Sequence, residues 1–171
     1  GLLYGYGLFE TIAVVNGRAL FLSEHLQRLQ RSAEKLGLPW PVNIEEKEFS
    51  LDEMVTAVNL FVRENATSFS DNRMVLRLIL LATTGNKEKE KGMFFASFTP
   101  YPYRADELER GWHAGLLPVR RNSTSPIVYH KTLNYLENYI CRRYARHRGW
   151  QEGLFVNELG YIAEGTATNI F

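Results

Sequence analysis

One lysine, Lys131, stands in the stretch HKTLNYLENYICRRYARHRGW (residues 130–150), just before a predicted amphipathic helix. Asn134 followed three residues later by Glu137 is typical of a helix N-cap, so Lys131 lies in the extended approach to that helix. The positive potential at a helix N-terminus favours the neutral amine, which is the form that makes a Schiff base with an aldehyde. By spacing alone, an ordinary exposed lysine is the competing interpretation.

Among the arginines of two predicted helices, Arg28 is the candidate for binding an anion. Arg28 lies in SEHLQRL, off the leucine stripe of its helix, and so points away from the core that this stripe forms. It is either an anion ligand or a plain solvated arginine. Four further arginines follow Lys131 and gather toward the end of the second helix, where cations suit the macrodipole, and we interpret them as a solvated helix end.

Several elements must position these side chains. Asn16-Gly17 predicts a tight hairpin turn between GLFETIAVV and RALFL. A helix from Ser23, as its cap, to Gly37 is predicted by an apolar stripe with spacings of four and three residues. The stripe consists of Leu22, Leu26, Leu29, Ala33 and Leu36. A capping box of Ser50 and Glu53 begins a second helix.

The remaining pattern divides the chain in two. Strands are predicted at 73–84 and 93–101, joined by the charged loop GNKEKEKG. Prolines then indicate a linker at 101–106, followed by a strand within 111–119, the helix after Lys131, and a closing hairpin through residues 158–160. We predict an α/β (α+β) protein with a small N-terminal domain (1–100), a linker (101–106) and the beginning of a larger domain (107–171).

Composition excludes several classes of function. The 171 residues are 45% hydrophobic, enough for a packed core, and 20 basic against 19 acidic residues leave a formal net charge of +1. One cysteine forms no intrachain disulfide and no CxxC metal site, and no apolar run reaches the roughly 18 residues of a membrane span. We expect a soluble, cytoplasmic protein with no metal site and no nucleic-acid or membrane partner.

The two ends suggest a partial chain. Gly1 opens directly into structured-looking sequence, and the chain stops at Phe171 while the strand pattern is still apolar. We therefore expect further sequence at both ends.

Four motifs occur together in order: YGYGLFETI, SEHLQRL, HKTLNYLEN and NELGYIAEGTATNIF. Together they resemble the class IV (fold type IV) pyridoxal-phosphate enzymes, which include branched-chain aminotransferases, D-amino acid aminotransferases and 4-amino-4-deoxychorismate lyases. The resemblance covers nearly the whole chain. It implies a two-domain fold, a homodimer and pyridoxal 5'-phosphate as cofactor.

The resemblance assigns roles to individual residues. Lys131 matches the lysine that carries the cofactor covalently, Glu164 the glutamate at the pyridine nitrogen, and Arg28 the arginine that binds the phosphate. Tyr135 resembles a tyrosine near the cofactor ring, and Thr166 lies in a stretch that lines the pocket. As residue types, a half-buried helix tyrosine and a strand threonine are the simpler interpretations of these two.

Departures from the family bear on the substrate. D-amino acid aminotransferases have a tyrosine where this chain has Phe9, and an arginine near Ala82-Thr83-Thr84, so the chain looks unlike that branch. Arg77 falls where other branches place a cation for the substrate carboxylate, although a solvent-facing strand arginine fits equally. Phe9 and Arg77 are thus the candidate substrate-binding residues.

The resemblance leaves three functions open. The first is an aminotransferase acting between an amino acid and a 2-oxo acid. The second is 4-amino-4-deoxychorismate lyase, favoured by the wording KTLNYL, which releases pyruvate and forms 4-aminobenzoate. The third is a non-catalytic relative that only binds, which the presence of both Lys131 and Glu164 argues against.

Overall fold

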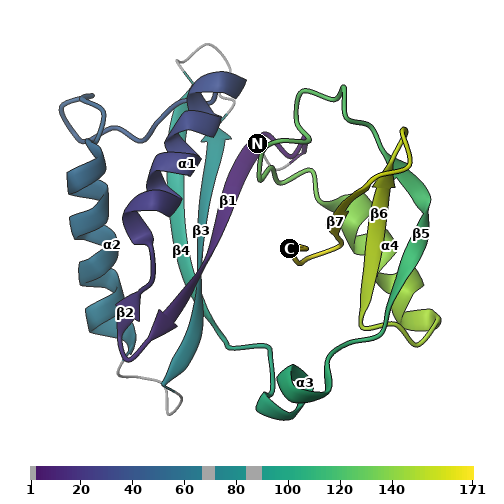
Figure 1. The fold of residues 1–171 in the computed structure, drawn as a ribbon. Coiled ribbons are helices and arrows are strands. Elements are labelled where there is room, and N and C mark those ends of the chain that lie inside the picture. The colour runs from purple at the N-terminus through teal and green to yellow at the C-terminus, as the bar shows by residue number, and fades with distance from the viewer. Residues whose placement is uncertain (1–2, 67–71, 84–89) are drawn as a thin grey trace. The chain divides into compact units, whose positions relative to one another are not determined.

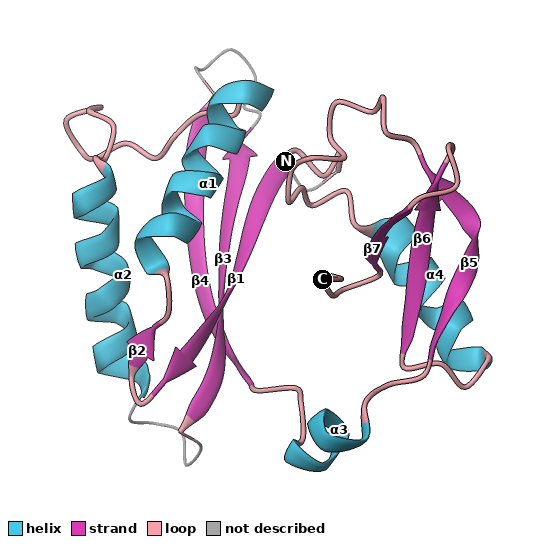
Figure 2. Cartoon of the chain, viewed as in Figure 1, coloured by secondary structure: helices cyan, strands magenta, loops and turns pink. Residues whose placement is uncertain are grey.

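The computed structural model describes residues 3–66, 72–83 and 90–171. The chain forms two compact units, each with helices and strands (Figures 1 and 2). The first unit contains Gly1–Tyr101 and His130–Leu133, and the second contains Pro102–Tyr129 and Asn134–Phe171. Lys131 therefore belongs to the first unit, whereas the helix that follows it belongs to the second.

A four-stranded antiparallel sheet forms the centre of the first unit. Its order is β2-β1-β3-β4, with bounds β1 Gly7–Val15, β2 Arg18–Ala19, β3 Arg73–Thr83 and β4 Lys91–Pro100. The predicted hairpin is confirmed, because Asn16 and Gly17 have positive φ angles of 49° and 71° between the paired residues Val15 and Arg18. Residues 85–89 of the expected charged loop lie outside the described residues.

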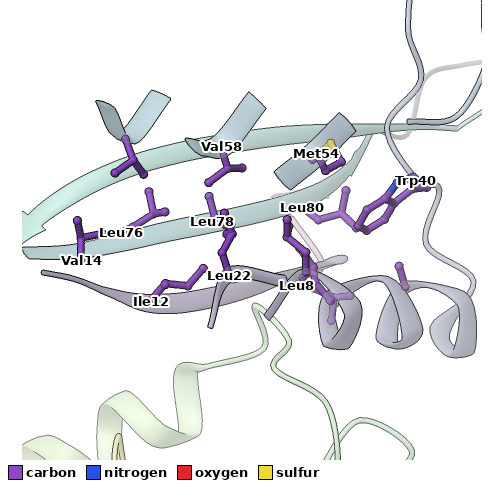
Figure 3. Packing of buried hydrophobic residues seen from close by; sticks show 14 of the residues in the cluster. Leu8, Ile12, Val14, Leu22, Trp40, Met54, Val58, Leu76, Leu78 and Leu80 are labelled. Carbon is purple, nitrogen blue, oxygen red and sulfur yellow. The ribbon is translucent and has the colours of Figure 1, made fainter. Parts of the chain in front are cut away.

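Two helices, α1 Leu22–Leu36 and α2 Leu51–Ala66, cover one face of this sheet (Figure 2). Alternate residues of β1 and β3 meet them in an apolar core (Figure 3), where each fully buried leucine contributes about 1.5–3 kcal/mol. The largest contributors include Leu8, Ile12, Leu26, Leu29, Leu76, Leu78 and Leu80. The opposite face of the sheet carries the other set of side chains, among them Phe9 and Arg77.

The helix ends were predicted with mixed success. The capping box of α2 is confirmed, since the main-chain N–H of Ser50 donates to Glu53 at 2.7 Å and that of Glu53 donates to the Ser50 hydroxyl at 3.3 Å. The Ser23 cap of α1 is wrong: the cap is Phe21, in a left-handed conformation with φ 54° and no side-chain hydrogen bond. Because the chain that leaves the hairpin already turns at Phe21, α1 starts at Leu22, one residue before Ser23.

The second unit has a three-stranded sheet, ordered β5-β6-β7, with one helix packed on it. Its elements are α3 Ala105–Arg110, β5 Ala114–Arg121, α4 Leu136–His147, β6 Glu152–Asn157 and β7 Ile162–Gly165. The strands β5 and β6 are parallel and joined through α4, while β6 and β7 form the predicted closing hairpin. Helix α3 begins inside the range expected as linker.

Helix α4 differs from its prediction. Its cap is Tyr135, without a side-chain hydrogen bond, so Asn134 is not the cap. The residues it buries are Asn138, Cys141 and Ala145, whereas Leu136 and Ile140, which an amphipathic helix is expected to bury, are exposed. None of the described helices is long and apolar enough to cross a membrane.

Candidate active site

The main chain around Lys131 pairs with the edge of β1. The N–H of Phe9 donates to the Lys131 carbonyl at 2.9 Å, and the N–H of Leu133 donates to the Gly7 carbonyl at 2.9 Å. This edge of β1 is open to a partner because β2 pairs only with Val14 and Val15. A strand distant in sequence thereby holds the main chain of residues 131–133 by two hydrogen bonds, one of them to the Lys131 carbonyl.

Gly7 permits this close approach. A Cβ atom at Gly7 would lie 2.6 Å from Leu133 Cδ1 and 2.6 Å from the Leu80 carbonyl oxygen, closer than real Cβ contacts occur. Gly7 is part of the motif YGYGLFETI, whose physical role here is to let the lysine segment reach the strand.

The Lys131 amine lies over an aromatic ring. Its Nζ atom is 4.6 Å from the centre of the Phe9 ring, within cation–π range for a charged amine. Phe9 was predicted as a substrate-binding residue on resemblance alone. The structure places it in direct contact with the amine, on the helix-free face of the sheet.

Arg28 is held by a buried carboxylate. Its Nε and Nη2 atoms donate to Oε1 and Oε2 of Glu10 at 2.6 and 2.5 Å, and His25 Nδ1 lies 2.8 Å from Oε2. The Glu10 side chain is 1% exposed and that of Arg28 is 51% exposed. Burial alone would raise the pKa of Glu10, but the hydrogen bonds from His25 and Arg28 outweigh it and keep this pKa below its usual value. Glu10 is thus an ionised carboxylate that sequence analysis missed.

Arg28 and Lys131 each contact one of two consecutive residues of β1. Glu10 directly follows Phe9, whose N–H is bonded to Lys131, and its side chain points to the opposite face. One turn after Arg28 on α1, the Ser32 hydroxyl lies 3.0 Å from His130 Nδ1. In the first unit, the predicted covalent anchor therefore contacts Phe9 and the predicted phosphate ligand contacts Glu10, whose side chains lie on opposite faces of the sheet.

Arg77 lies on the helix-free face of the sheet. It pairs in register with Thr11 on one side and Ser97 on the other, and it is exposed. Phe9 pairs with Ile79, two residues from Arg77, so the two predicted substrate residues project from the same face. This position suits a cation that meets an anionic substrate group near the Lys131 amine.

In the second unit, Glu164 lies on β7 and pairs with an arginine. Arg121 Nε donates to Glu164 Oε1 at 2.8 Å, Nη2 donates to Asn138 Oδ1 at 2.5 Å, and Nη1 donates to Glu137. The guanidinium also stacks over the Phe155 ring, 3.9 Å from its centre. Sequence analysis missed Arg121, whose only signal was an arginine at the end of a strand.

Tyr135 and Thr166 are bonded to each other. The Tyr135 hydroxyl donates to the Thr166 carbonyl at 2.7 Å, and Asn138 Nδ2 donates to the same oxygen at 3.0 Å. Burial raises the pKa of Tyr135 above its usual value. The two residues predicted to lie near the cofactor ring thus form one hydrogen-bonded cluster of the second unit.

A second missed carboxylate, Glu152, fixes the loop after β7. It is 4% exposed and accepts hydrogen bonds from the Thr166 N–H at 2.9 Å and the Thr168 hydroxyl at 2.9 Å, as well as from the Thr166 hydroxyl. Burial would raise the pKa of Glu152, but these bonds and one from the Gly153 N–H outweigh it and lower this pKa. Thr166 is wholly buried, with its hydroxyl donated to Glu152.

Known proteins are similar to this chain in sequence and in fold. The sequence profile of the family amino-transferase class IV matches residues 7–171. A putative branched-chain-amino-acid aminotransferase of Methanocaldococcus jannaschii is 31% identical over all of this chain and 57% of its own length. The aminodeoxychorismate lyase of Bacillus subtilis is 26% identical over all of this chain and 56% of its own length.

A solved structure is similar as well. A hypothetical aminotransferase from Mycobacterium tuberculosis in its PLP-bound form superimposes with a TM-score of 0.76 at 30% identity, covering 96% of this chain and 56% of that one. The chain belongs to the class IV aminotransferases. It spans little more than half the length of the relatives it matches.

Proposed function

We propose that the protein containing this chain is a pyridoxal-phosphate-dependent aminotransferase that moves an amino group between an amino acid and a 2-oxo acid. The observation that supports it most directly is the setting of Lys131: its carbonyl and the N–H of Leu133 are hydrogen-bonded to β1, and its amine lies 4.6 Å from the Phe9 ring centre. The donor set also fits the cofactor, because an amine suits its aldehyde, a guanidinium its phosphate and a carboxylate its pyridine nitrogen.

Each residue has a distinct task. Bound pyridoxal phosphate supplies an aldehyde that links to an amine and a ring that withdraws electrons from the substrate α-carbon. Lys131 would hold the cofactor through Nζ and, with its amine free, would take the proton from the substrate α-carbon. Glu164 keeps a proton on the pyridine nitrogen, and Arg28 binds the phosphate.

The other predicted residues support binding. Arg77 pairs with the substrate carboxylate, and Phe9 packs beside the amine that accepts the proton. Tyr135 lines the side of the cofactor ring, and the carbonyl of the buried Thr166 holds it there by a hydrogen bond. From the resemblance we further infer a homodimer. From the single cysteine we infer a cytoplasmic location.

The reaction type is tested on the full-length protein in two arms. One offers a panel of amino acids with 2-oxoglutarate, and the other offers aminodeoxychorismate with no 2-oxo acid. We expect amino exchange in the first arm. Pyruvate release in the second arm, without exchange in the first, would establish the lyase, the alternative that the wording KTLNYL favours.

Replacing Arg28 by alanine is expected to raise the dissociation constant of pyridoxal phosphate about tenfold or more. The substitution removes a charge-assisted contact of about 1.5–3 kcal/mol to the phosphate while Lys131 and Glu164 remain. Spectroscopic titration of the full-length protein measures the constant. Arg31→Ala, on the same helix and exposed, is the matched control. Equal cofactor retention by the two variants on dialysis counts against the role of Arg28.

A further inference from the structure

We propose that Glu10 is the positioning residue of the phosphate site: it fixes the Arg28 guanidinium in the orientation that receives the cofactor phosphate. The inference rests on the proposed function, because it takes Arg28 as the phosphate ligand. It adds a residue that touches no ligand and acts through the arginine.

Glu10 contacts only one edge of the Arg28 guanidinium. Glu10 occupies the edge formed by Nε and Nη2, at 2.6 and 2.5 Å, and His25 Nδ1 lies 3.3 Å from Nη2. Among the described residues, Nη1 has no hydrogen-bond partner, and the side chain is 51% exposed. A guanidinium gripped along one edge presents its remaining N–H groups in a fixed direction, which suits a planar fork that binds phosphate.

The burial of Glu10 makes the grip rigid. Its side chain is 1% exposed, beneath α1 and between Leu8 and Ile12, which are fully buried. Its carboxylate cannot change partners without leaving a buried charge unpaired, which is costly. An arginine fixed in advance loses little side-chain freedom when the phosphate binds.

Strand β1 sets both ends of the site. Phe9 is bonded through its N–H to Lys131 and contacts the amine, and the next residue, Glu10, holds Arg28. Consecutive residues therefore fix the anchor for the aldehyde end and the anchor for the phosphate end. The competing role for the Glu10–Arg28 pair is a purely structural one, in which the ion pair only holds α1 on β1. That role predicts a different result in the experiment below.

The test compares two ligands that differ only in phosphate. In the full-length protein, Glu10→Gln keeps the shape but replaces one oxygen by an NH2 donor that faces the donors of Arg28. We expect the dissociation constant of pyridoxal phosphate to rise about tenfold while that of pyridoxal changes less than about twofold. A purely structural role alone lowers stability and leaves the ratio of the two constants unchanged, and that result would overturn the proposal.

Three other variants separate the possible failures. Leu78→Ala removes the buried neighbour that pairs with Glu10 in register, so it is expected to lower stability and not the ratio. If Arg28→Ala changes the ratio but Glu10→Gln does not, the inference is wrong and the proposed function stands. If neither variant changes the ratio of the two dissociation constants, Arg28 does not bind the phosphate. The inference about Glu10 and the proposed role of Arg28 then both fail. Should Glu10→Gln not fold, Glu10→Asp, which keeps the charge but withdraws the carboxylate, is expected to change the ratio in the same direction.

Discussion

Replacing Lys131 by alanine is expected to abolish covalent attachment of pyridoxal phosphate to the full-length protein and to abolish turnover. Lysine is the side chain that both links reversibly to an aldehyde and, once released, moves a proton at the substrate α-carbon. Borohydride reduction makes the link permanent, and peptide mapping of the reduced protein locates it. A label on any other lysine would contradict the assignment.

The same variant is expected to stay folded. The hydrogen bonds that hold this segment on β1 are made by the main chain of residues 131 and 133, which alanine retains. We expect the free energy of unfolding to change by less than about 0.5 kcal/mol in urea denaturation. Lys47→Ala, at an exposed position, serves as the control for loss of a lysine and should keep both the label and the turnover.

Much of the first unit could be predicted because its signals are local. The Asn16-Gly17 turn needs a positive φ at both residues, and the leucine spacing of α1 follows from the geometry of a helix. The docking of Lys131 on β1 has no such signal. It joins Phe9 to a residue more than a hundred positions away, and it depends on β2 being too short to cover the edge of β1.

The helix caps show where local rules lose to tertiary structure. Ser23 has a good capping side chain, but the hairpin that precedes it imposes a left-handed Phe21 and starts the helix early. Asn134 likewise precedes a helix whose first residue is Leu136, with Tyr135 at the cap. Because Tyr135 bonds to Thr166, long-range contacts fix this helix end.

The missed residues of the site are charged groups largely withdrawn from solvent. Glu10 lies inside the apolar strand β1, whereas Glu152 begins β6 and Arg121 ends β5; a charge in such a place is costly unless it is paired. A charged residue inside an apolar strand pattern is a signal that sequence alone provides. The partner of such a charge cannot be predicted in the same way, because the partners Arg28, Glu164 and Thr166 come from other parts of the chain.

Replacing Glu164 by glutamine is expected to leave the cofactor bound while turnover falls by about two or more powers of ten, the size of a strong electrostatic contribution. Glutamine keeps the shape, and its oxygen can still accept the Arg121 Nε hydrogen bond that Oε1 accepts at 2.8 Å. What it loses is the charge that keeps the pyridine nitrogen protonated, so proton removal at the substrate α-carbon becomes harder while the lysine link and the phosphate contact persist. Glu137→Gln is the matched control, because Glu137 pairs with the same arginine and has no predicted role at the ring. Steady-state rates and the cofactor absorbance of both variants are compared. Equally reduced rates in the two variants would show that the loss of turnover comes from removing a charge beside Arg121 and not from the role of Glu164 at the ring. An unchanged rate in Glu164→Gln would remove Glu164 from the mechanism.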